Sequence, residues 1–342
     1  MKKVNEQSQS RYWSLVDDLD QFDLGNSDAQ VSEWHNFKAL NLNKSGVATF
    51  LKSDIKLEAF RLQAYVAIPE APGFIGLVFG ARDSSNYELI YLSPGNNDGN
   101  GEIQYDPVMN GATTWQIYNG PNYLTNAPYI VGEWIKFTLE VHQKIAKVYI
   151  GDTETPQMII SNLQHGTVEG KIGIWGYLPV YIRDLSIEDL SDQSFDEYEN
   201  NQIISKGFIT DWLVSDPYFE DSRMSDLNWT KTVTEENGTL NLNRLFASVK
   251  DSIVQVKSSV TVVEETQSII SFGFSDHLRL WINDQEIYNG SWLWSPPESD
   301  GRIRPEHITI PVGWNSGTNS IRAEITSRET VFGWGFCLKT GI

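Results

Sequence analysis

The chain has 342 residues, of which 40% are apolar and 21% are charged. Its formal net charge of −19 excludes non-specific binding to phosphate backbones and to anionic lipid, so we expect no nucleic acid and no membrane partner. A single cysteine, Cys337, excludes an intramolecular disulfide framework and a cysteine-rich metal site, and we expect it to be a buried core thiol.

The hydropathy pattern and the N-terminus predict the cellular location. No apolar run reaches the roughly 18 residues that a membrane-spanning helix needs. Residues 1–10 include two lysines but no apolar segment of the kind found in a secretory signal. We therefore expect a cytoplasmic protein, or an extracellular one if a signal has been removed. The oligomeric state is left open.

Short runs in which apolar and polar residues alternate predict strands in the first half of the chain. No segment before residue 190 keeps the apolar spacing of an amphipathic helix over three turns. Many short strands separated by turn residues favour a sandwich or jelly roll. The predicted strands are residues 47–51, 57–66, 74–79, 87–92, 134–141, 146–150 and 170–175.

The second half shows the same alternation, and an acidic stretch with few apolar residues precedes it. We predict an all-β chain with two antiparallel β-sandwich (jelly-roll) domains, each long enough to bury its own core. The expected division is a flexible N-terminus at 1–11, a sandwich at 12–190, an acidic linker at 191–205 and a sandwich at 206–342. Strands of the second half are predicted at 240–242, 259–263, 268–274, 278–282, 307–310 and 320–325.

Particular runs give each half a family resemblance. Residues 12–190 resemble a concanavalin A-like (laminin-G-like) jelly roll, on the strand–turn–strand run at 76–92 and the runs at 132–152 and 170–175. Residues 206–342 resemble the galactose-binding-like jelly rolls attached to glycosidases. That resemblance rests on the strand and Asn-Asp turn at 276–288, the Trp-containing turn and strand at 311–325, and the Trp-Gly-Phe strand at 333–338. These resemblances imply a fold, and they imply a function only by analogy.

One branch of the concanavalin A-like fold cleaves glycans with a strand of closely spaced acids, Glu-x-Asp-x-(x)-Glu. Glu102 and Asp106 are the nearest equivalents, and two-residue alternation puts them on one strand face. Gln104 occupies the position of the middle acid. We therefore assign no catalytic residue, and Glu102 and Asp106 stay as candidates if the chain is a glycoside hydrolase or lyase-like enzyme.

The sequence offers little evidence for metal binding. The five histidines lack ligand spacing, so we expect no zinc. The loop around residues 96–101 has oxygen-bearing side chains at alternating positions, but an EF-hand would need an acid where Pro107 stands. No cofactor is expected except calcium, for which the candidate ligands are Asn96, Asp98 and Asn100.

Aromatic residues are the strongest lead to function, since the chain has 12 Trp, 14 Tyr and 15 Phe. Sugar rings pack their C–H faces on aromatic rings, while their hydroxyls bond to amides and carboxylates. We predict a platform of Trp115, Tyr105 and Tyr118 with Gln104, Asn122 and Arg82 as hydrogen-bond partners. In the second half, Trp292, Trp294 and Trp314 fall in loops or turns and are candidate contacts, whereas Trp281 and Trp334 are expected in the core.

Three classes of function follow from these features. The first is a non-catalytic or accessory carbohydrate-binding protein with a glycan partner. The second is an enzyme that cleaves glycosides on the concave face of the first domain. The third is a structural or protein-interaction module. Exposed tryptophans with amides and acids favour the first class, a deep pocket with paired carboxylates favours the second, and a flat apolar patch favours the third.

Overall fold

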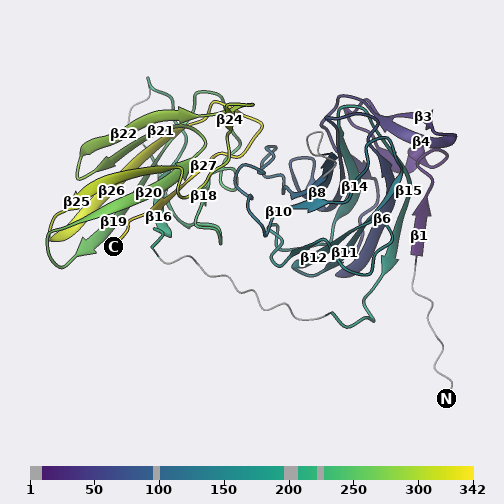
Figure 1. The fold of residues 1–342 in the computed structure, drawn as a ribbon, viewed down its shortest axis with the longest axis horizontal. Helices are drawn as coiled ribbons and strands as arrows, with labels where there is room; N and C mark the ends of the chain where they lie inside the picture. The colour runs from purple at the N-terminus through teal and green to yellow at the C-terminus, as the bar shows by residue number, and fades with distance from the viewer. Residues whose placement is uncertain (1–9, 95–100, 196–206, 222–226) are drawn as a thin grey trace, which may run out of the picture. The chain divides into compact units, whose positions relative to one another are not determined.

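A computed structural model describes residues 10–94, 101–195, 207–221 and 227–342 (Figure 1). Within these ranges the chain forms antiparallel β-sheets and one short 3-10 helix, η1 (Leu19–Gln21), with no α-helix. The predicted all-β class is therefore confirmed. No helix in the described part of the chain is long and apolar enough to span a membrane.

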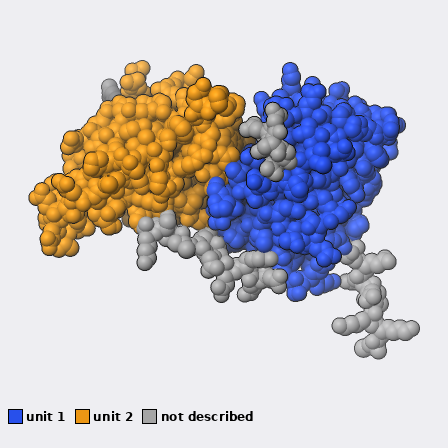
Figure 2. All heavy atoms as spheres, viewed as in Figure 1, with its two compact units in different colours: residues 1–108, 120–200 blue, residues 109–119, 201–342 orange. Residues whose placement is uncertain are grey.

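The chain divides into two compact units (Figure 2). Unit 1 contains residues 1–108 and 120–200, and unit 2 contains residues 109–119 and 201–342. The short segment 109–119 thus belongs to unit 2 although it lies within the first half of the sequence. The chain consequently passes from one unit to the other after residues 108, 119 and 200.

Unit 1 has two sheets. The eight-stranded sheet has the order β13 (Met158–Ile160), β12 (Ile145–Ile150), β11 (Ile135–His142), β6 (Ala59–Ala67), β15 (Val180–Asp189), β4 (Phe37–Leu42) and β3 (Gln30–Trp34), with β1 (Ser10–Trp13) also paired to β15. The seven-stranded sheet has the order β10 (Leu124–Ala127), β9 (Gly101–Tyr105), β8 (Asn86–Pro94), β7 (Phe74–Asp83), β14 (Lys171–Tyr177), β5 (Thr49–Leu51) and β2 (Phe22–Asp23).

Alternation along the strands of unit 1 separates core from surface. In β6, Leu62, Ala64 and Val66 are fully buried, whereas the intervening side chains are partly exposed. The rings of Phe60 in β6 and Phe79 in β7 meet edge to face at 6.2 Å, which joins the two sheets across the core. Burial of one side chain in two is the pattern expected of a sandwich strand.

Unit 2 also has two main sheets. The six-stranded sheet has the order β17 (Trp229–Val233), β16 (Asp211–Ser215), β19 (Ile253–Val262), β26 (Gly317–Thr326), β21 (Asp276–Ile282) and β22 (Gln285–Trp292). The four-stranded sheet has the order β18 (Leu240–Asn241), β27 (Gly335–Lys339), β20 (Thr266–Phe274) and β25 (Ile308–Trp314), and a small ladder joins β23 (Trp294–Ser295) to β24 (Ser299–Asp300).

The core of unit 2 is aromatic. Trp334 is fully buried there, as predicted, and Cys337 is a buried core thiol whose pKa burial raises to about 12. Trp281 is also buried, but it lies on the outer side of its sheet, where the guanidinium carbon of Arg322 is 3.8 Å from its ring centroid. Trp281 is thus covered by a charged side chain and not by the opposing sheet.

Candidate functional site

Segment 109–119 is held in unit 2 by hydrogen bonds to loops of that unit. The amide and hydroxyl of Thr113 both donate to the carbonyl of Val331, at 3.1 and 2.9 Å. The amide of Ile303 donates to the carbonyl of Gln116 at 2.9 Å, and the side-chain amide of Asn119 donates to the carbonyl of Ile303 at 3.0 Å. Both of these loops therefore depend on the segment for backbone partners.

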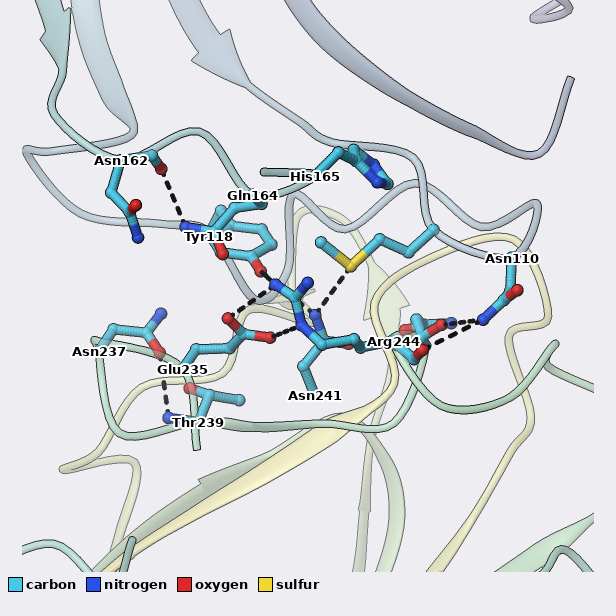
Figure 3. Close-up of polar contacts among 12 residues, drawn as sticks. Asn110, Tyr118, Asn162, Gln164, His165, Glu235, Asn237, Thr239, Asn241 and Arg244 are labelled. Carbon is cyan, nitrogen blue, oxygen red and sulfur yellow. Dashed lines mark hydrogen bonds and ion pairs between the residues drawn. The ribbon is translucent and has the colours of Figure 1, made fainter. Parts of the chain in front are cut away.

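Tyr118 anchors the segment (Figure 3). Its buried hydroxyl accepts a hydrogen bond from Arg244 Nη2 at 3.2 Å and one from Asn241 Nδ2 at 3.3 Å. Arg244 in turn donates to both carboxylate oxygens of Glu235, at 2.7 and 2.9 Å. Burial acts to lower the pKa of Arg244, but its bonds to Glu235 and Tyr118 outweigh burial and hold that pKa above its ordinary value.

Three aromatic rings meet where segment 109–119 lies against the loop that follows β26. The ring of Phe332 is 5.4 Å from that of Trp115 and 5.9 Å from that of Trp294, both in edge-to-face geometry. The side chain of Trp294 is 50% exposed, and those of Trp115 and Phe332 are partly exposed. We call Trp115, Phe332 and Trp294 the aromatic patch of unit 2.

Polar side chains border this aromatic patch. The two carboxylate oxygens of Glu329 accept from the backbone amide of Trp294 at 3.0 Å and from Gln116 Nε2 at 3.2 Å. The guanidinium carbon of Arg302 lies 5.2 Å from the ring centroid of Trp115. An acid, an amide and a cation thus surround the exposed rings, so the patch differs from a plain apolar contact surface.

Asp276 holds the loop that carries Glu329 and Phe332. Its side chain is fully buried, and its carboxylate accepts from the amides of Arg328 at 2.9 Å and Glu329 at 3.2 Å. Burial raises the pKa of Asp276 to about 7, against the opposing effect of these amide bonds. The position of Glu329 beside the aromatic patch therefore depends on a carboxyl group that titrates near neutrality.

Two glycines allow the segment to approach these loops closely. A Cβ at Gly333 would lie 2.9 Å from Ile117 Cγ1 and 3.1 Å from the Cβ of Gln116. A Cβ at Gly301 would lie 2.4 Å from Gln116 Nε2, and the φ of Gly301 is +65°. Both positions therefore require glycine, one for close contact and the other for contact and backbone conformation.

Trp292 was predicted in a loop, but it is the last residue of β22, and it supports the site without forming part of the aromatic patch. Its indole nitrogen donates to the carbonyl of Arg302 at 3.2 Å, and its ring lies 4.0 Å from the imidazole of His307. Burial lowers the pKa of His307, with a smaller contribution from Arg304. Trp292 therefore fixes the backbone of the loop that presents Arg302.

The predicted platform of Trp115, Tyr105 and Tyr118 requires correction. Tyr105 belongs to unit 1, where its hydroxyl donates to Glu88 at 2.7 Å and its side chain is fully buried. Tyr118 is equally buried, in unit 2. Two rings without exposed surface cannot stack on a sugar, so only Trp115 of the three stays available.

The predicted hydrogen-bond partners of that platform lie in unit 1. Gln104 is 1% exposed, and its amide donates to the carbonyls of Tyr105 at 2.6 Å and Tyr123 at 3.3 Å. Arg82 is exposed at the end of β7 and lies 3.3 Å from His165 Nδ1, and Asn122 is exposed in a loop. All three side chains thus belong to unit 1, whereas Trp115 belongs to unit 2.

Trp314 is a further correction, because it is a core residue. It is the last residue of β25, it is fully buried, and its indole nitrogen donates to Ser268 Oγ at 2.8 Å. The neighbouring Gly313 and Asn315 suggested a turn, but the strand continues as far as Trp314. The register that buries Val312 also buries Trp314, two residues later.

The catalytic and metal-binding candidates of the sequence analysis are Glu102 and Asp106, and Asn96, Asp98 and Asn100. Glu102 is partly buried on β9, opposite Ser93 and Asn126, and Asp106 is 1% exposed just beyond the strand. In the described ranges no group of three or more His, Cys, Asp or Glu residues is arranged to hold a metal ion. The calcium candidates Asn96, Asp98 and Asn100 lie outside the described residues, so calcium binding stays a prediction.

Sequence reasoning missed Phe332, Arg302 and Glu329, which complete the site. Phe332 follows β26 and precedes Gly333, so a large ring in a short loop was a usable signal. Glu329 and Arg302 look like ordinary loop charges, and no local pattern identifies them. Their place in the site follows from the position of segment 109–119.

Comparisons with known proteins add structural similarities only. No family model matches the chain, and no curated protein matches its sequence. The carbohydrate-binding module CBM66 from Bacillus subtilis is 14% identical with a TM-score of 0.37, over 49% of this chain and 96% of that one.

A protein of unknown function with a galectin-like fold, from the same organism, is 11% identical with a TM-score of 0.39, over 54% of this chain and 98% of that one. A structure described as a native glycosidic hydrolase is 11% identical with a TM-score of 0.35, over 54% and 97% of the two chains. The two family resemblances inferred from the sequence stay predictions, and we base the proposed function on the geometry of the site.

Proposed function

We propose that the chain is a non-catalytic carbohydrate-binding protein and that the aromatic patch of unit 2 contacts the sugar. The observation that carries this proposal is the convergence of Trp115 and Trp294 on Phe332, with half of the surface of Trp294 exposed. An exposed indole offers a flat apolar face to the C–H groups of a sugar ring. The edge-to-face contact with Phe332 and the hydrogen bond from the Trp294 amide to Glu329 hold that face in place before the ligand arrives.

The polar border of the aromatic patch supplies partners for sugar hydroxyls. A hydroxyl group donates to a carboxylate and accepts from a guanidinium, and Glu329 and Arg302 provide these two groups beside the rings. Glu329 is already oriented by Trp294 and Gln116. Orientation in the free protein reduces the entropy lost when a ligand binds.

The carboxylates near the aromatic patch favour binding over hydrolysis. A glycosidase needs two carboxyl groups facing the bond that breaks, one as acid and one as base or nucleophile. Both oxygens of Asp276 accept backbone amide bonds inside the protein, and Asp300, whose backbone pairs with Trp294, is held in ion pairs with Arg302 and Arg304. In unit 1, Asp106 is almost fully buried. The hydrolase alternative is therefore less well supported.

A glycan array probed with the full-length chain tests this proposal. We expect at least one oligosaccharide to bind reversibly and to be recovered without cleavage, as checked by mass spectrometry of the eluted sugar. Parallel arrays with calcium and with chelator separate a calcium effect at Asn96, Asp98 and Asn100 from sugar recognition. Shortened sugars would support the glycosidase alternative, and an array without bound glycans would contradict the proposed function.

A further inference from the structure

The outer face of the eight-stranded sheet in unit 1 carries a second cluster of rings, centred on a charged pair. The pairing of β15 with β6 shifts register between Arg183 and Ser186, and Asp184 in this bulge has φ of +57°. Neighbouring strand residues usually point to opposite faces, but a bulge re-aims one of them. Here it allows Arg183 Nη1 to donate to Asp184 Oδ2.

Three rings from separate strands or their ends enclose the Arg183 guanidinium. Its central carbon is 4.2 Å from the ring centroid of Phe37, 4.5 Å from that of Tyr65 and 5.0 Å from that of Trp134. Phe37 and Trp134 also meet edge to face at 6.2 Å. Such ring contacts favour a cation and hold its plane in a fixed orientation.

The cluster remains open to solvent. Phe37 is 46% exposed, and the side chains of Arg183 and Asp184 keep 17% and 29% of their surface exposed. Tyr12 is 60% exposed, and its hydroxyl donates to Asp184 Oδ1. That hydrogen bond raises the pKa of Tyr12 to about 12, so the hydroxyl stays a donor at neutral pH.

We propose that this cluster, formed by Phe37, Tyr65, Trp134, Arg183 and Asp184, is a second site and that its ligand is a neutral sugar with adjacent hydroxyl groups. An anionic sugar would meet the Asp184 carboxylate and the net charge of −19, and a cationic ligand would meet Arg183. A pair of adjacent hydroxyls suits both charges, because each hydroxyl donates and accepts. The exposed ring of Phe37 supplies the apolar surface for the sugar ring.

This proposal concerns a site in unit 1 and does not depend on the aromatic patch of unit 2. The experiment is titration calorimetry on the full chain with tetrasaccharides of glucose, xylose, mannose, galactose and arabinose, and with tetragalacturonate as an acidic comparator. The background is Trp294→Ala, which removes the most exposed ring of the unit 2 patch. Phe37→Ala and Asp184→Asn are added to this background singly.

We expect a neutral tetrasaccharide to bind the Trp294→Ala background, and both added substitutions to weaken this binding about tenfold. Asn tolerates the positive φ of position 184, so Asp184→Asn tests the charge without straining the bulge. Tyr177→Ala is the matched control, because Tyr177 is 44% exposed on the other sheet of the same unit. We expect Tyr177→Ala, added to the same background, to keep its affinity for the neutral tetrasaccharide within about twofold of the background protein.

Four results would overturn the proposal. The Trp294→Ala background could bind no neutral sugar, or it could prefer tetragalacturonate. Adding Asp184→Asn could leave the affinity unchanged, or Tyr177→Ala could be the one added substitution that abolishes binding. Sugar binding that Trp294→Ala abolishes entirely would leave the unit 2 function standing and remove this site. If Trp294→Ala leaves sugar binding intact and Phe37→Ala abolishes it, the site in unit 1 stands and the function proposed for unit 2 falls.

Discussion

Trp115 and Trp294 come from opposite halves of the sequence, and both place their rings edge to face on Phe332. Trp115 reaches this position because residues 109–119 are part of unit 2. The candidate site is therefore built from segment 109–119 and from loops of the second half of the sequence, all within unit 2. The geometry of the site depends on how firmly segment 109–119 is held by the rest of unit 2.

The anchor is tested by Tyr118→Phe, which removes only the hydroxyl. Arg244 and Asn241 each lose a buried acceptor, so we expect the free energy of unfolding to fall by about 1–3 kcal/mol. Urea unfolding of the full chain measures this change. Tyr177→Phe is the control, since its ring is 44% exposed, and it should change stability by less than about 0.5 kcal/mol. Equal effects of the two substitutions would contradict the anchoring role.

Asp276 predicts a pH dependence of stability. Its pKa is about 7 in the folded protein and near 4 when unfolded, so the folded state holds the proton more tightly. This contribution is complete below about pH 4 and is lost as pH rises to about 7, for a total of roughly 2–4 kcal/mol. Asp276→Asn removes this pH-dependent contribution. The Asn side chain also has only one oxygen to accept the amides of Arg328 and Glu329, so we expect the variant to lose stability at every pH.

Thermal unfolding between pH 5 and pH 8 tests this expectation. Relative to the wild-type chain, Asp276→Asn should be clearly less stable at pH 5 and closer to it at pH 8. Asp211→Asn, at an exposed position in β16, provides the control and should run parallel to the wild type. Parallel curves for Asp276→Asn as well would show that this carboxyl does not titrate near neutrality.

Close packing around Gln116 is tested by Gly301→Ala. The added Cβ would lie 2.4 Å from Gln116 Nε2 and 3.0 Å from the backbone nitrogen of Trp294, at a φ of +65°. We expect a loss of about 1–3 kcal/mol in stability and weaker sugar binding. Gly313→Ala is the control, because its Cβ would meet no atom within 4 Å. A Gly301→Ala protein that matches this control in stability and affinity would contradict the packing described here.

The fold follows from local patterning, and the site does not. Alternation alone predicted a strand at 57–66, and β6 spans Ala59–Ala67, because one face of the sheet must be buried. The same alternation explains the burial of Trp314 once the strand predicted at 307–310 is extended as far as Trp314. The assignment of residues 109–119 to unit 2 has no local signal, since it depends on Asn241, Arg244 and other partners far along the chain.

Two predicted residues illustrate this division. Trp294 was identified from a predicted loop; it begins the two-residue strand β23 instead, but it is exposed at the candidate site as expected. Tyr105 was placed beside Trp115 because they are near in sequence, but alternation turns its ring into the core of unit 1, where its hydroxyl donates a hydrogen bond to Glu88. Composition thus identified aromatic residues as the residue type of the site. Whether a given aromatic ring can contact a ligand depends on the direction in which its side chain points.

The central claim, that the aromatic patch of unit 2 binds sugar, is tested most directly by the affinity of Trp294→Ala for the best glycan from the array. We expect a loss of about 1–3 kcal/mol, or roughly 5- to 150-fold in Kd by calorimetry, with an unchanged melting temperature. Trp229→Ala is the matched control, since that partly exposed ring also lies beside a cation, with Lys257 Nζ at 3.9 Å, and it should bind like the wild type. A folded Trp294→Ala protein with wild-type Kd would contradict the claim.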